Sequence, residues 1–288
     1  MLKVSVLFET VGSGVRMGTK IVDRRLVGCL LSSSVVFVLF CLVFPLFVIL
    51  VVPFASSTAT FTTRNLAQNE TDEVALRAFK LKIFRDAQGV LNSWNDSSHF
   101  CEWEGITCGY RRRRVTVLNI SSKGLSGSLS PYIGNLSFLK RFVLYNNSIQ
   151  GEIPHEFGRL RRLKYLILSN NSLVGEIPAN LSHCSRLVEL YVQGNKLVGK
   201  IPSKFDSLYN LEVLSLSRNN LTGQIPSFLG NLTSLKVLAV SYNSFGGNIP
   251  HSLGRLKNLT VLRLGVNNFF GTVPHSFYDL SSLEIFCV

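Results

Sequence analysis

The sequence carries a repeat with a period of 24 residues, and this repeat limits the possible folds more than any other feature. Glycine recurs every 24 residues from Gly127 to Gly271, proline from Pro154 to Pro274, and asparagine from Asn147 to Asn267. Such self-similarity is the signature of a repeat architecture. Because one short unit cannot bury its own apolar face, successive copies are expected to stack into a solenoid.

The strand of each unit can be predicted from residues 210–233, NLEVLSLSRNNLTGQIPSFLGNLT. Leu214 and Leu216 alternate with Ser215 and Ser217, which is the period-2 pattern of a short strand with its leucines inward. Strands of neighbouring repeats are therefore expected to pair in parallel in one curved sheet.

The rest of the unit predicts how the chain returns to the next strand. We expect the short amide of Asn219 to bond main-chain groups of the turn and to form a ladder with its equivalents. Gly223 permits a left-handed backbone at a corner, and Pro226 suits a convex segment outside the sheet. Leu229 and Leu232 are predicted to close the core from the back.

Four segments are predicted from these patterns. Residues 1–57 are a leader, 58–113 an N-terminal cap, 114–281 seven repeats, and 282–288 a truncated eighth copy. Since the last residue falls inside a predicted strand, the final coil would expose its apolar edge. We therefore expect a longer solenoid that was cut, either biologically or in the gene model.

The leader contains the densest apolar stretch of the chain. Residues 26–63 have no Asp, Glu, Lys or Arg, four basic residues lie just before them, and small residues follow at 55–57. This order is typical of a secretory signal peptide, although the length of the run and Pro45 leave a retained signal anchor as the alternative. Either reading exports the remainder, so we expect a plasma-membrane protein facing outside or a secreted one. No second apolar run approaches the length of a membrane span.

Ten sequons predict that the exported chain is glycosylated. They begin at Asn69, Asn95, Asn119, Asn135, Asn146, Asn170, Asn180, Asn220, Asn231 and Asn258.

The net charge of +13 is concentrated in arginine clusters at 111–114 and 159–162. Export makes nucleic acid an unexpected partner. The clusters are interpreted either as a solvated face or as a site for acidic wall polysaccharide or an acidic protein.

The repeat, with its G-x-I-P half, resembles the plant-type leucine-rich repeat. Residues 73–80, the L-x-S-W at 91–94 and the C-x-W-x-G-I-x-C at 101–108 resemble the N-terminal cap of plant leucine-rich-repeat receptor-like kinases, especially the immune-receptor subfamily. The resemblance implies an α/β solenoid, a right-handed superhelix with a parallel concave β-sheet and a helical N-terminal cap.

The cap is expected to cover the exposed edge of the first coil. Residues 72–83 predict a helix with Val74, Leu76, Phe79 and Ile83 as its apolar stripe. In an oxidising compartment, Cys101 and Cys108 would form a disulfide. A metal site using His99 is the weaker alternative. Cys184 is predicted to be a buried thiol, and Cys287 to lie in an outward strand position.

We find no catalytic pattern in the sequence. The glycine-rich loop, lysine, H-R-D and D-F-G motifs of a kinase are missing, although a full-length relative would carry a Ser/Thr kinase domain. His155, His251 and His275 share one repeat position and are interpreted as solvated. We therefore predict no enzyme activity, no cofactor and no metal.

Binding is expected on the concave face, which is lined by outward strand positions. Sequons at Asn119, Asn146 and Asn170 would crowd its first three repeats, so the open part would be repeats four to seven. Tyrosine and arginine are frequent binding hot spots, although aromatic residues also simply fill exposed β surfaces. The candidate ligand-binding residues are Tyr191, Gln193, Arg218, Tyr242 and Arg263.

These observations predict the extracellular recognition portion of a plant receptor-like kinase, without its membrane helix and kinase. A peptide or protein would be its ligand, and a co-receptor ectodomain a further partner. Contact with a membrane would come only through an uncleaved leader or a missing C-terminal region. The alternatives are a secreted standalone repeat protein, such as a polygalacturonase inhibitor, and a structural or decoy fragment.

Overall fold

The computed structural model describes residues 72–288. The predicted leader and the sequon at Asn69 lie outside this part of the chain. Within it, no helix combines the length and the apolar character needed to cross a bilayer.

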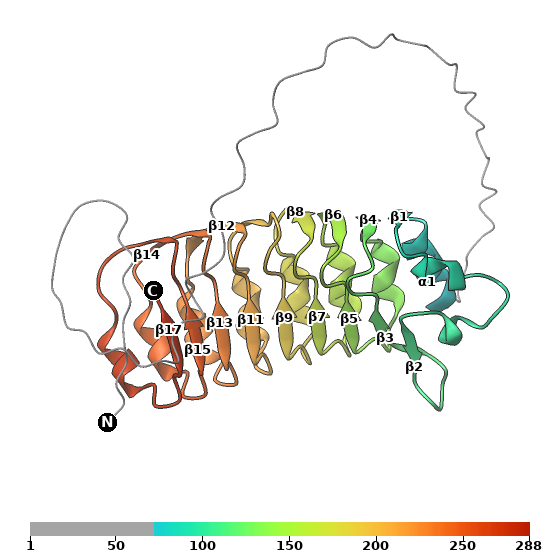
Figure 1. Cartoon of the computed structure of the whole chain (residues 1–288). Helices are drawn as coiled ribbons and strands as arrows, with labels where there is room; N and C mark the ends of the chain where they lie inside the picture. Colours follow the sequence, from blue (N-terminus) through green and yellow to red (C-terminus); the bar gives the residue numbers. More distant parts are fainter. Residues whose placement is uncertain (1–71) are drawn as a thin grey trace, which may run out of the picture. The chain divides into compact units, whose positions relative to one another are not determined.

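The repeats place their strands side by side in one long sheet (Figure 1). The sheet has nine strands in the order β17-β15-β13-β11-β9-β7-β5-β3-β2, and all neighbours are parallel except β2 and β3. The predicted parallel sheet of a solenoid is thereby confirmed. Its strands are β2 (Ile106–Cys108), β3 (Val115–Asn119), β5 (Arg141–Val143), β7 (Tyr165–Ile167), β9 (Glu189–Tyr191), β11 (Val213–Ser215), β13 (Val237–Ala239), β15 (Val261–Arg263) and β17 (Ile285–Cys287).

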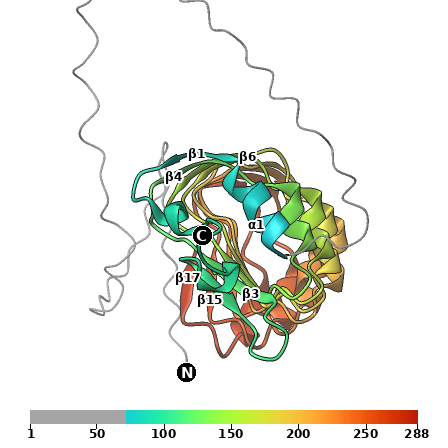
Figure 2. The same ribbon diagram turned by 90° about the vertical axis from the view of Figure 1, so that its right-hand side faces the viewer.

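A second row of short strands, which the sequence pattern did not predict, lies on another side of each coil. Viewed from the end, this row lies at the top and the long sheet at the lower left (Figure 2). One sheet has the order β1-β4-β6-β8 and another β10-β12-β14-β16, with an isolated bridge between Glu176 and Val198. The strands are β1 (Ile83–Asp86), β4 (Leu125–Ser128), β6 (Ser148–Glu152), β8 (Ser172–Val174), β10 (Val198–Gly199), β12 (Asn220–Gln224), β14 (Ser244–Gly247) and β16 (Asn268–Phe269).

The third side of each coil is a short 3₁₀ helix. In the fifth coil, η8 (Ser227–Asn231) begins after Pro226, whose backbone is extended with φ −69° and ψ 137°. A Cβ on Gly230 would approach the carbonyl oxygen of Ser252 to 2.2 Å, so glycine is required where neighbouring helices meet. The other 3₁₀ helices are η2 (Val90–Ser93), η3 (Phe100–Glu102), η4 (Pro131–Asn135), η5 (His155–Arg159), η6 (Ala179–His183), η7 (Ser203–Ser207), η9 (His251–Arg255) and η10 (His275–Asp279).

The apolar side chains of all three sides meet in one continuous core. Leu214 and Leu216 of the strand and Leu229 and Leu232 of the convex side are fully buried, as predicted. The same core runs from the N-terminal cap to Leu283. Stacking therefore supplies burial that a single coil lacks.

The repeated asparagines form the predicted ladder between coils. The amide nitrogen of Asn195 donates to the carbonyl oxygens of Leu168 (3.0 Å) and Val192 (2.9 Å), one in the preceding coil and one in its own. Its amide oxygen accepts from the backbone N–H of Leu173 at 3.0 Å. Each asparagine thus satisfies main-chain groups that the turn leaves unpaired.

The N-terminal cap is helical, but its helix is shorter than predicted. Helix α1 covers Asp72–Lys80, with Leu76 and Phe79 buried. The prediction that it extends to Ile83 is wrong, because the chain turns after Lys80 and Ile83 starts β1, which pairs antiparallel with β4. Local periodicity could not reveal a strand whose partner lies about 40 residues along the chain.

The cap is held by stacked rings, a disulfide and a buried charge. The rings of Trp94 and Trp103 stack with centroids 5.4 Å apart, and Cys101 and Cys108 form a disulfide. The carboxylate of Asp72 accepts from Arg114 at 2.6 and 2.9 Å, and also from a backbone N–H. This bonding raises the pKa of Arg114, partly against the effect of burial.

We predict that Asn195→Ala destabilises the protein by about 2–4 kcal/mol, because it leaves buried backbone groups without partners. The matched control is Lys196→Ala, since Lys196 is exposed and its side chain forms no hydrogen bond with described residues. Urea unfolding of the two variants measures the difference. Equal stability of the two would contradict a structural ladder.

Candidate functional site

The five candidate residues lie on or directly beside the strands of the long sheet. Tyr191 ends β9 and Arg263 ends β15. In the sheet register, Ser215 and Ala239 lie between them. Three strand spacings therefore separate Tyr191 from Arg263, which is roughly 14 Å.

Between these residues the face consists of small side chains, which we call the small-residue floor. Its members occupy two neighbouring repeat positions in repeats five to seven: Ser215, Ser217, Ala239, Ser241 and Gly265. Val213, Val237 and Val261 flank it on one side. The floor leaves room for a ligand main chain, and the larger side chains stand around it.

Arg218 and Tyr242 occupy a turn position with a left-handed backbone, which the sequence analysis did not anticipate. Both have φ 57°, and the same repeat position is held by Asn146, Asn170 and Gly194. Asparagine and glycine tolerate this conformation, whereas arginine and tyrosine are strained by it. Non-permissive residues held in strained backbone are a feature of functional sites.

The two strained residues also contact each other. The guanidinium carbon of Arg218 lies 5.3 Å from the ring centroid of Tyr242, within the range of a cation–π interaction. Both side chains are exposed, and 49% of Tyr242 is accessible to solvent. The pair is therefore ordered and available to a ligand at the same time.

At the other end of the floor, Tyr191 is half-buried beside an acid. Burial, and then the neighbouring charge of Glu189, raise the pKa of Tyr191, so its hydroxyl stays protonated. The amide oxygen of Gln193 and the hydroxyl oxygens of Ser169 and Ser217 are buried without a partner in the described part. These three residues occupy one repeat position in successive coils, and buried polar atoms of this kind are rare.

The sequence analysis did not commit to an equivalent pair in the early repeats. The guanidinium carbon of Arg141 lies 4.4 Å from the ring centroid of Tyr165, one strand further along. Arg112, Arg114 and Arg162 surround the ring of Phe138 at 5.5, 4.8 and 4.0 Å. A comparison of residues 24 apart would have found the Arg114, Phe138 and Arg162 row.

The sequons on the early concave face are exposed. Asn119, Asn146 and Asn170 all lie on the surface, and the last two have a left-handed backbone. Crowding of this end by glycans stays a prediction. Asn180, by contrast, is half-buried in η6.

Metal or nucleophilic chemistry has little support in the described residues. No group of three or more potential metal ligands occurs in residues 72–288. Cys184 is fully buried, as predicted, and burial raises the pKa of its thiol to about 12, partly against the charge of Arg161. A thiol so rarely ionised is a poor nucleophile.

A cavity of about 600 Å³ lies at the last coils, lined mainly by apolar residues that include Phe269, Phe277 and Phe286. None of the five candidate residues lines it.

The comparisons with known proteins agree with this architecture. Residues 110–248 match the leucine-rich repeat region model, and residues 69–109 match the leucine rich repeat N-terminal domain model. Over 87 residues the chain is 51% identical to the LRR receptor-like serine/threonine-protein kinase EFR of Arabidopsis thaliana, a match to 30% of this chain and 8% of that relative.

Solved ectodomains have similar folds. The Arabidopsis receptor kinase HAESA, solved in complex with the peptide hormone IDA and the co-receptor SERK1, aligns with TM-score 0.69 and 38% identity over 75% of this chain and 37% of that one. Pollen Receptor Kinase 3 aligns with TM-score 0.61 and 32% identity over 70% of this chain and 98% of that one. The chain thus spans a small part of EFR and about a third of the HAESA chain.

The buried thiol makes a pH-dependent prediction. The pKa of Cys184 is raised from 9.0 to about 12, so its contribution to stability is complete below about pH 9 and is lost as the pH rises towards 12. Relative to Cys184→Ala, the free energy of unfolding of the wild type should fall between about pH 8 and 10.5. Urea unfolding at both pH values measures this difference, and a constant difference would contradict a neutral buried thiol.

Proposed function

We propose that this chain, which belongs to the leucine-rich-repeat family of plant receptor ectodomains, binds a short extended peptide across the small-residue floor. The observation that carries the proposal is the strained, stacked and exposed Arg218–Tyr242 pair beside that floor. Such rigid aromatic and arginine side chains make strong binding anchors because little conformational entropy is lost when they engage a ligand.

The size of the site limits the peptide segment that it contacts. The roughly 14 Å between Tyr191 and Arg263 corresponds to about four residues of extended chain. Small side chains along this path would let the peptide main chain approach the sheet. The unpartnered polar atoms of Gln193 and Ser217 are suited to bond that main chain after small side-chain rotations.

The charges around the floor suggest an orientation for the peptide. Arg218 and Arg263 lie at the later repeats, and Glu189 lies beside Tyr191 at the earlier end. A peptide with an acidic residue near the arginines and a hydrogen-bond donor near Glu189 would complement this pattern.

The relatives support the same role. HAESA was solved with a peptide hormone and a co-receptor, and this chain shares its fold. We therefore also propose that the chain acts on the extracellular side of the plasma membrane or as a secreted protein, and that a co-receptor ectodomain is a further partner. The matching family models describe leucine-rich-repeat regions, so the proposed role is recognition and not catalysis.

We predict that the double variant Arg218→Asn with Arg263→Ser lowers affinity for selected peptides at least 10-fold. Asparagine occupies the same left-handed position at Asn146 and Asn170, so this change removes the guanidinium without new backbone strain. The probe is a library of random 12-residue peptides selected on the secreted full chain, with dissociation constants from calorimetry.

The matched control removes two exposed lysines from other sides of the coils, as Lys200→Gln with Lys204→Gln. Its affinity for the selected peptides should stay within about twofold of the wild type. Selected peptides that bind both variants equally well, or no enrichment of peptides at all, would overturn the proposal.

A further inference from the structure

The strongest unexplained feature of the surface is a concentration of positive charge along one edge of the first repeats. We call it the basic edge: Arg111, Arg112, Arg113, Arg114, Lys140, Arg141, Arg161, Arg162 and Lys164. These residues come from the β2–β3 hairpin and from the loops that enter β5 and β7. The three segments, 110–114, 137–141 and 161–165, contain no acidic residue.

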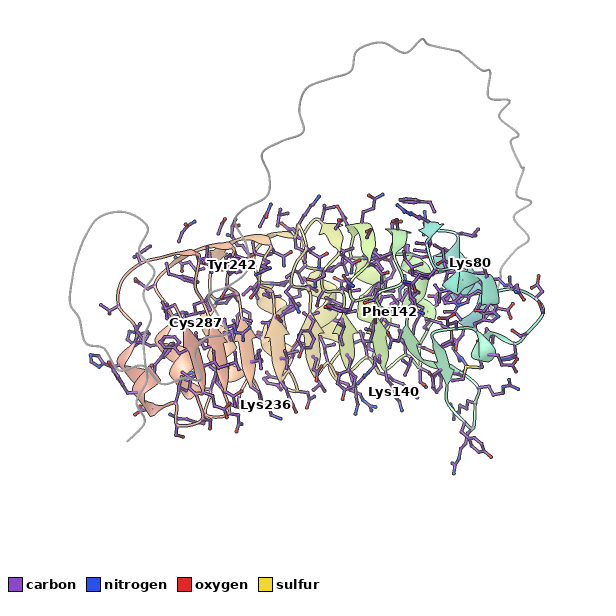
Figure 3. The ribbon with its side chains drawn as sticks, viewed as in Figure 1. Lys80, Lys140, Phe142, Lys236, Tyr242 and Cys287 are labelled. Atoms are coloured by element: carbon purple, nitrogen blue, oxygen red, sulfur yellow. A yellow bond between two sulfur atoms is a disulfide. The ribbon has the colours of Figure 1, made fainter. Side chains whose placement is uncertain are left out.

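The basic edge is not a by-product of repeat duplication. The equivalent loops of the later repeats, at 185–189, 209–213, 233–237, 257–261 and 281–285, carry basic and acidic residues in equal number. In one later loop pair, Lys236 forms an ion pair with Glu212. Figure 3 shows Lys140 and Lys236 along the same edge of the molecule, so the charge is confined to one end of a shared edge.

Neighbouring elements neutralise the basic edge only slightly. Arg114 is paired with Asp72 of α1. Within residues 72–288, Arg112, Arg162 and Lys164 form no ion pair. Their unscreened charges raise the local positive potential, which attracts anions.

The arginines are also arranged around aromatic rings. Three guanidinium groups converge on Phe138 within 5.5 Å of its centroid. Contact with a ring holds an arginine side chain in place while its N–H groups remain available. Tyr110, at the tip of the hairpin, is fully exposed and adds an aromatic face to the same surface.

We propose that the basic edge binds an acidic polysaccharide, a polymer of sugars that bear carboxylate groups. Arginine forks match carboxylates in bidentate geometry, and exposed aromatic faces suit sugar rings. An acidic protein is the less favoured partner, because protein interfaces usually have an apolar centre depleted of charge. This proposal is independent of the peptide site, which lies in the later repeats.

The test uses the full chain and immobilised polygalacturonate as the probe, with fully methyl-esterified polygalacturonate as the uncharged control ligand. We expect binding to the charged polymer only, with an affinity that falls steeply as sodium chloride is raised from about 50 to 300 mM. Equal binding to the esterified polymer would overturn the proposal.

The triple variant Arg112→Gln, Arg162→Gln and Lys164→Gln should weaken this binding at least 10-fold. The matched control, Lys196→Gln, Lys200→Gln and Lys204→Gln, removes the same charge from exposed positions elsewhere and should change affinity less than twofold. Equal losses in the two variants would show an effect of net charge alone and would overturn the assignment.

A second variant guards against misfolding of the first. Arg111→Gln with Arg112→Gln alters only exposed residues of the hairpin tip and should weaken binding at least threefold. Polyglutamate of matched length is the last arm. Tighter binding to polyglutamate than to polygalacturonate would assign the basic edge to an acidic protein instead.

Discussion

The structure depends on the hydrogen bonding of each coil by its neighbours. Backbone groups of every turn are satisfied across the coil boundary, both by strand pairing and by the amide of an asparagine such as Asn195. Because buried main-chain groups must be paired, a coil is stable only within the stack. The 24-residue period is the sequence record of this requirement, since each asparagine must meet the same groups one coil away.

The rigidity of the ladder explains how strained residues persist on the concave face. The turn that contains the ladder asparagine forces a left-handed backbone at the preceding position in several repeats. Asn146, Asn170 and Gly194 accept this conformation easily, whereas Arg218 and Tyr242 do so only because the ladder fixes the backbone around them. The same scaffold thus offers glycosylation sequons at one end and a stacked Arg–Tyr pair at the other.

Sequence reasoning succeeded where the repeat speaks for itself and failed where partners are distant. The parallel sheet, the buried leucines, the asparagine ladder and the buried Cys184 follow from periodic positions. The end of α1 at Lys80 did not, because Ile83 pairs with β4 from the first repeat. The second row of strands was also missed, since strands of two to five residues leave little periodic signal.

For this protein, the sequence alone determined the repeat, its core and the family to which it belongs, because a period over many copies averages out local ambiguity. Only the tertiary structure decided which surface residues act together. It placed Tyr242 against Arg218 and gathered three arginines around Phe138. Such groupings depend on side chains 24 or more residues apart meeting across coils, and their backbone angles and ring contacts are set by stacking.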